Sequence, residues 1–213
     1  IVSPAPQAMA NGSSDLQRIP VTFQVAIIGH RGAGKSALAQ AACAESDHGG
    51  PMLEELADGV QLRRVATFFN CFSVLVDFVE MPSDDRYHSL LPYFGGSAAC
   101  IALVVNILDP SGHADLCNRL AALGSPPPCG VLVVQGSLPS GTASGEERRR
   151  LEPLRDVATR WGLKFMRFES LEQLGRARIL QSVCELVLGD IPDRGDPMHL
   201  LGRRVARGAA TTA

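Results

Sequence analysis

A glycine-rich segment from Gly29 to Ser36 constrains the fold of this chain more than any other feature. It reads Gly-His-Arg-Gly-Ala-Gly-Lys-Ser and matches the phosphate-loop pattern G-x-x-x-x-G-K-[ST] at every defined position. With 21 glycines and two lysines in 213 residues, chance would give roughly 0.002 such matches. An apolar, β-branched run, Val21–Ile28, precedes the segment, and an Ala/Leu-rich helical stretch, Ser36–Glu45, follows it. Strand, glycine loop and helix is the local order that this motif requires.

The chemistry of such a loop is the binding of phosphate. Its backbone N–H groups surround the phosphates, its lysine reaches the terminal ones, and its hydroxyl binds Mg²⁺ at a helix N-terminus whose dipole favours anions. If a nucleotide is held, the residues expected to hold it are Gly29, Gly32, Gly34, Lys35 and Ser36.

The remaining pattern predicts alternating strands and helices. Residues 46–59 are expected to form an irregular acidic loop, residues 82–97 include a short helix, and a tight turn at Asn70-Cys71 indicates an antiparallel hairpin. Further helices are expected over residues 114–123, 146–161 and 175–189. The predicted strands are Val21–Ile28, Val60–Phe69, Phe72–Val79, Cys100–Ile107, Val131–Val134 and Lys164–Phe168.

This alternation predicts an α/β domain. Its sheet is expected to be mostly parallel and six-stranded, with one antiparallel edge strand and helices on both faces. The domain spans residues 21–189, after a flexible leader, 1–20, and before a flexible Arg/Gly-rich tail, 190–213.

Composition excludes several classes of function. The formal charge of −2 argues against a general binder of nucleic-acid backbones. The longest apolar runs are far shorter than the roughly 18 residues of a membrane span. The six cysteines include no C-x-x-C pair, so most of them are expected to be core residues in a reducing compartment.

The order and spacing of the elements resemble those of the Ras-like small GTPases, from Val21 to about Gly189. In that family a threonine after the first helix closes over Mg²⁺ and the γ-phosphate, but this chain has no threonine between Ser36 and Thr67. The family's D-x-x-G is matched to Asp77–Glu80, which keeps the aspartate and replaces the glycine, and Met81 stands where a glutamine would orient water. The resemblance therefore implies Ser36 and Asp77 as metal ligands if Mg-nucleotide is held, but no usual route of hydrolysis.

The family's motifs for recognising guanine are also missing. Gln135–Leu138 replaces N-K-x-D, and Leu138 cannot accept the ring N–H donors, which costs on the order of 1–3 kcal/mol per unpaired donor. Arg167–Leu171 retains only a serine of the S-A-K pattern. The phosphate loop is thus the one complete motif of the five.

A Ras-like core without these motifs resembles the centromere protein M family, the pseudo-GTPase subunits of the inner kinetochore. The likeness covers about Phe23 to Leu201 and lies in residues 103–106, 130–137, 154–161, 189–192 and 198–201. It implies a non-catalytic adaptor without a cofactor, located in the nucleus at the centromere and bound to centromere proteins I, H and K. The glycine loop of that family is degenerate, whereas here it is complete, so nucleotide binding stays open.

A partner surface is expected at three apolar segments: Phe78-Val79, Leu90–Phe94 and Met198–Leu201. Arg203, Arg204 and Arg207 form a weakly basic tail, through which a contact with nucleic acid is possible. The alternative function is a small GTPase or P-loop NTPase switch, nuclear or cytoplasmic, that binds Mg-GTP or Mg-ATP with relaxed base specificity.

Overall fold

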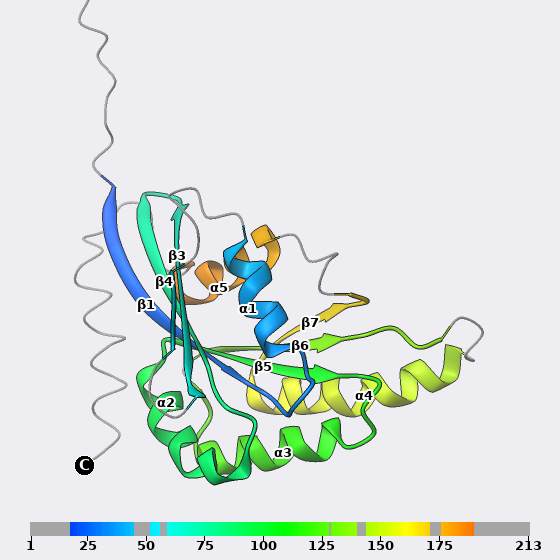
Figure 1. The fold of residues 1–213 in the computed structure, drawn as a ribbon. Helices are drawn as coiled ribbons and strands as arrows, with labels where there is room; N and C mark the ends of the chain where they lie inside the picture. Colours follow the sequence, from blue (N-terminus) through cyan, green and yellow to red (C-terminus); the bar gives the residue numbers. More distant parts are fainter. Residues whose placement is uncertain are drawn as a thin grey trace, which may run out of the picture.

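The structure, a computed structural model, describes residues 18–44, 52–55, 59–127, 129–139, 144–170 and 176–189. These residues form one sheet of seven strands in the order β2-β3-β4-β1-β5-β6-β7 (Figure 1). The strands are β1 (Ile19–Ile28), β2 (Met52–Glu55), β3 (Gln61–Phe69), β4 (Phe72–Glu80), β5 (Cys100–Asn106), β6 (Gly130–Gln135) and β7 (Lys164–Phe168).

β3 is the strand that runs against the others. It pairs antiparallel with β4 on one side and with β2 on the other, whereas the β1–β4, β1–β5, β5–β6 and β6–β7 pairs are parallel. β1 pairs with β4 over the nine residues Ile19–Ile27 but with β5 only over Val25–Ile28. The half-sheet β2-β3-β4-β1 is therefore joined to β5-β6-β7 over the last four residues of β1, next to the glycine loop.

Helices cover both faces of the sheet (Figure 1). On one face α1 (Lys35–Cys43) and α5 (Arg176–Leu188) bury a core that includes Val25, Ile27 and Val76. On the other face α2 (Leu91–Ser97), α3 (Gly112–Leu123) and α4 (Ser144–Trp161) bury a second core around Ile28, Leu103 and Leu132. A 3-10 helix, η2 (Asp85–Leu90), precedes α2.

The α/β class, the mostly parallel sheet and the single antiparallel strand agree with the sequence-based prediction. Asn70, with φ of 52°, makes the left-handed turn of the predicted β3–β4 hairpin. One expectation is wrong in part, because Met52–Glu55, within the expected acidic loop, forms β2. This seventh strand adds to the six predicted ones and replaces β3 at the edge of the sheet. The predicted leader ends too late by two residues, because Ile19 and Pro20 already belong to β1 and pair with β4. Residues 1–17 and the tail lie outside the described residues.

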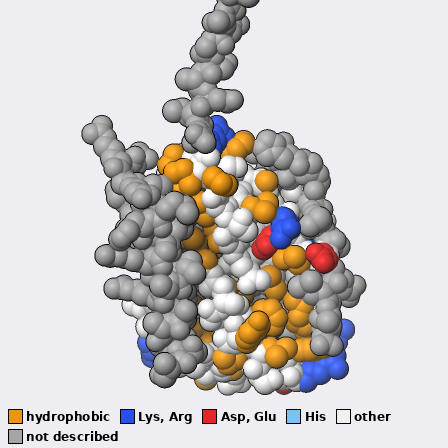
Figure 2. Space-filling view, turned by 90° about the vertical axis from the view of Figure 1, so that its left-hand side faces the viewer, with side chains coloured by type: hydrophobic (Ala, Val, Ile, Leu, Met, Phe, Trp, Pro, Cys, Tyr) orange, Lys and Arg blue, Asp and Glu red, His pale blue; other side chains and the backbone are white. Residues whose placement is uncertain are grey.

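Figure 2 shows the side of the molecule on the left of Figure 1, where β1, β3 and α2 lie. Among the described residues on this side, hydrophobic side chains are common and charged ones are few. Within the described parts of the chain, no helix is long and apolar enough to cross a membrane.

Candidate functional site

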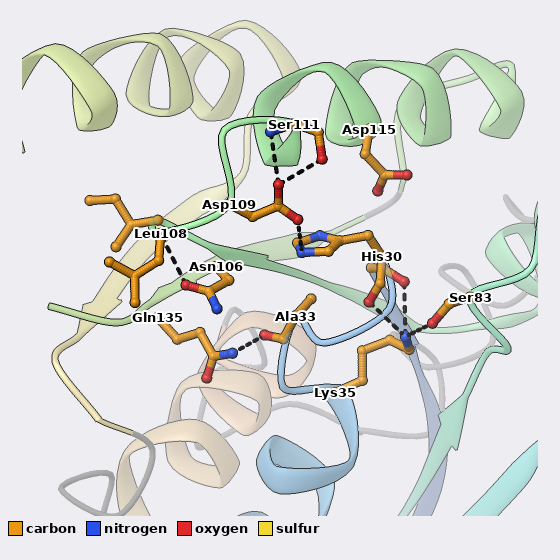
Figure 3. A network of polar contacts seen from close by, with 12 residues as sticks. His30, Ala33, Lys35, Ser83, Asn106, Leu108, Asp109, Ser111, Asp115 and Gln135 are labelled. Carbon is orange, nitrogen blue, oxygen red and sulfur yellow. Dashed lines mark hydrogen bonds and ion pairs between the residues drawn. The ribbon is translucent and has the colours of Figure 1, made fainter. Parts of the chain in front are cut away.

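The glycine loop connects the end of β1 to the start of α1, at the carboxyl edge of the sheet. Gly32 and Gly34 have φ of 79° and 92°, a left-handed conformation that glycine adopts without strain. Lys35 is only 6% exposed, and its side chain folds back over the loop. Its Nζ donates to the carbonyls of Gly29 at 2.9 Å and His30 at 3.1 Å, and also to Ser83 Oγ (Figure 3).

Ser83 links the loop to α3. It follows β4, and its carbonyl accepts a hydrogen bond of 3.0 Å from Nη2 of Arg119, which is 2% exposed. The carboxylate of Asp115, one turn earlier on α3, accepts hydrogen bonds from Nε and Nη2 of Arg119 at 2.7 and 3.1 Å. The segment after β4 is therefore fixed from both sides, by Lys35 at the hydroxyl and by Arg119 at the carbonyl.

The carboxylate next to the loop belongs to Glu80, the last residue of β4. Its Oε1 accepts a hydrogen bond of 2.6 Å from Ser36 Oγ, and its Oε2 is buried without a hydrogen-bond partner. Asp77, the residue expected to join Ser36 at a metal, lies three positions earlier and is engaged elsewhere. Its two oxygens accept from Arg64 of β3 at 2.6 and 2.9 Å. The structure thus pairs Ser36 with Glu80 rather than with Asp77.

Burial governs the charge of Lys35. The pKa of Lys35 is lowered from 10.5 to about 8, chiefly because burial removes the ammonium group from water, and the positive charge of Arg119 acts in the same direction. The carboxylates of Glu80 and Asp115 act in the opposite direction, Glu80 more strongly. An anion bound in the loop would likewise favour the protonated form of Lys35.

The side chain of Gln135 closes the loop from the end of β6. Its Nε2 donates to the carbonyl of Ala33 (Figure 3). A Cβ atom at Gly34 would displace the amide group of Gln135 from Ala33, so a substitution here would lose this contact in addition to the cost of the positive φ. Gln135 takes the first position of the missing base motif, yet it contacts the phosphate loop.

A second link joins the loop to the turn between β5 and α3. His30 Nε2 lies 2.9 Å from Asp109 Oδ2, and Asp109 Oδ1 accepts from the N–H and hydroxyl of Ser111 at 2.8 and 2.7 Å (Figure 3). The pKa of Asp109 is lowered chiefly by these hydrogen bonds from Ser111. Three different chain segments, after β4, β5 and β6, therefore contact the glycine loop.

The side chains at the positions expected to recognise a base are not suited to bind guanine. Leu138 is partly exposed after β6 and carries no hydrogen-bonding group. At the end of β7, Arg167 forms an ion pair with Glu147 of α4. Within the described residues, no group of three or more His, Cys, Asp or Glu side chains is placed to hold a metal ion.

The expected partner surface is only partly exposed. Phe78, Val79 and Leu91 are each at most 1% exposed and belong to the core, so their assignment to a docking surface is wrong. Leu90 and Tyr93 are 36% and 73% exposed and remain available. Residues 198–201 and the arginines at 203, 204 and 207 lie outside the described residues.

No model of a protein family matches the chain, and no curated protein matches it.

Proposed function

We propose that this protein is a Ras-like, P-loop domain that acts as a non-catalytic adaptor within a protein assembly. The strand order β3-β4-β1-β5-β6-β7, with β3 antiparallel, supports the Ras-like assignment, as does the glycine loop between β1 and α1. By resemblance to the centromere protein M family, the assembly is the inner kinetochore in the nucleus, and the partners are centromere proteins I, H and K.

The observation that carries this proposal is the engagement of the two ligand-binding side chains by the protein itself. The ammonium of Lys35 contacts Ser83 Oγ, and the hydroxyl of Ser36 contacts Glu80 at 2.6 Å. A bound phosphate and Mg²⁺ would have to displace both contacts, and the carboxylate of Glu80 repels phosphate. No carboxylate stands at Leu138 to add binding energy from a guanine ring.

A second candidate, a nucleotide-binding P-loop protein with relaxed base choice, is favoured by the same Ser36–Glu80 pair. A hydroxyl beside a carboxylate is a ligand set that suits Mg²⁺, and Glu80 Oε2 has no partner. In this candidate Lys35 would hold the terminal phosphates of Mg-GTP or Mg-ATP, and Glu80 would replace Asp77 as the carboxylate at the metal.

A titration with fluorescent GTP and ATP analogues, with and without Mg²⁺, separates the two candidates. For the adaptor we expect no saturable binding at micromolar concentrations and no phosphate release above that of Lys35→Ala. Ser83→Ala frees the ammonium of Lys35 and is expected to increase any weak binding. Saturable, Mg²⁺-dependent binding by the unmodified chain, abolished in Lys35→Ala, would contradict the adaptor and favour the second candidate.

The adaptor also requires a docking surface. Among the described aromatic residues, Tyr93 has the most exposed side chain. Large exposed aromatic side chains are the groups that most often anchor protein interfaces. Tyr93→Ala, with or without Leu90→Ala, should reduce co-purification with the kinetochore partners at least tenfold while the circular dichroism spectrum stays unchanged.

Phe68→Ala provides a matched control, because Phe68 is 42% exposed on β3, away from α2. Equal losses in Tyr93→Ala and Phe68→Ala, or no loss in either, would refute this surface. Leu91→Ala is unsuitable as a surface variant because Leu91 is buried.

A further inference from the structure

Two of the six thiols lie opposite each other at the start of neighbouring strands. β5 begins at Cys100, and Cys129 immediately precedes β6. Ile101 pairs with Gly130 in the parallel register, and the N–H of Ile101 donates to the carbonyl of Cys129 at 3.1 Å. Neighbouring strands lie about 4.8 Å apart, which falls within the Cα separation of about 4.4–6.8 Å that a disulfide bond requires.

Both side chains point to the same face of the sheet. Cys100 belongs to the core beneath α1 and α5, and Cys129 packs against that core. The Sγ of Cys129 donates to the carbonyl of Ala99 at 2.8 Å, the residue just before Cys100. A hydrogen bond with Cys129, together with burial, raises the pKa of the Cys100 thiol well above its ordinary value. The two thiols therefore lie on the same face of the sheet at opposing positions of neighbouring strands.

We propose that Cys100 and Cys129 form a reversible cross-strand disulfide bond when the protein meets a peroxide. Cys129 is partly exposed, so its sulfur attacks the peroxide oxygen, breaks the O–O bond and becomes a sulfenic acid, while one water leaves. The buried sulfur of Cys100 then attacks Cys129 Sγ and displaces the hydroxyl group, which leaves as a second water with the thiol proton of Cys100. Two thiols and one hydrogen peroxide thus give one disulfide and two waters.

The bond would join the start of β5 to the residue before β6, and would so close β5 and α3 into a loop. The candidate functional site lies at the opposite ends of these strands, beyond Asn106 and Gln135, so the bridge would stabilise the fold without altering the glycine loop. A reducing thiol reverses the reaction, which agrees with a redox-responsive rather than a permanent disulfide in a reducing compartment. This proposal is independent of the proposed function.

The test is mild oxidation of the full chain with one equivalent of hydrogen peroxide, followed by non-reducing peptide mapping. We expect the loss of two hydrogen atoms, a peptide pair that links Cys100 to Cys129, and a rise in Tm of about 5 °C or more that dithiothreitol reverses. Cys129→Ser and Cys100→Ala should each abolish the linked peptide and the rise in Tm.

Cys71→Ser is the matched control, because Cys71 is exposed and its loss should leave the bridge intact. Cys129→Ser is the safer of the two test variants, since this side chain is only partly buried. Conversion of Cys129 to sulfinic acid without a bridge, a bridge through another cysteine, or a bridge between two chains would each overturn the proposal.

Discussion

Replacement of Lys35 by methionine measures how much the buried ammonium group lowers the free energy of unfolding. Lys35 is 6% exposed, and burial lowers its pKa from 10.5 to about 8. At about 1.4 kcal/mol per pH unit, the charged group reduces the free energy of unfolding by about 3 kcal/mol at neutral pH. Methionine has a similar length and no charge, so it removes this cost together with three hydrogen bonds.

The pH dependence gives the sign of the effect. Below pH 8 Lys35 is protonated in both the folded and the unfolded state, and the cost is fully present. Between about pH 8 and 10.5 the folded state has released the proton while the unfolded state still binds it, so stability rises with pH. Relative to Lys35→Met, the wild-type protein should therefore gain about 3 kcal/mol across this window.

Urea denaturation at several pH values from 7 to 10.5 tests this prediction. Lys164→Met is the matched control, because Lys164 is the other lysine and its side chain is 38% exposed in an ion pair with Glu185. Glu80→Gln removes the strongest influence that raises the Lys35 pKa, so the rise in stability should begin below pH 8. A constant difference between the wild-type protein and Lys35→Met across the range would refute the reasoning.

Two further predictions concern residues around the loop. Asp115→Asn should destabilise the fold by about 2–3 kcal/mol in urea denaturation, because it leaves a buried guanidinium without its counter-charge, whereas the exposed Asp156→Asn should change stability by less than about 0.5 kcal/mol. Gly34→Ala should lower the free energy of unfolding more than Gly32→Ala, because both positions have positive φ but only a Cβ at Gly34 meets Gln135. In a Gln135→Ala background the difference between the two variants should become smaller. An unchanged difference would contradict the steric explanation.

The sheet was largely predictable because apolar, β-branched runs mark buried strands. Cys100–Asn106 and Gly130–Gln135 are buried almost throughout and are easily recognised. β2 was missed because Met52–Glu55 has only four residues, two of them carboxylates, and its existence depends on pairing with β3. Such an edge strand has no periodic signal of its own.

The site was predictable only where its residues are local in sequence. The loop motif identifies Lys35 and Ser36. That Ser36 pairs with Glu80 and not with Asp77 depends on the neighbouring strand, because Arg64 of β3 binds both oxygens of Asp77. Ser83 and Arg119 are separated by 36 positions and are brought together only by the packing of α3 against the sheet. The short 3-10 helix before α2 decides that Leu90 is exposed and Leu91 buried, and apolar composition does not distinguish the two.

The position of β1 at the middle of the sheet also sets the order of assembly during synthesis. β1 is the earliest described strand along the chain, yet its partners, β4 and β5, begin only at Phe72 and Cys100. At about 5–20 residues per second on the ribosome, β4 is synthesised several seconds after β1. Because the β3–β4 hairpin closes through local contacts, we expect it to form first and β1 to pair onto it. Until that moment Val25 and Ile27, fully buried in the folded protein, are exposed to chaperones and to other nascent chains.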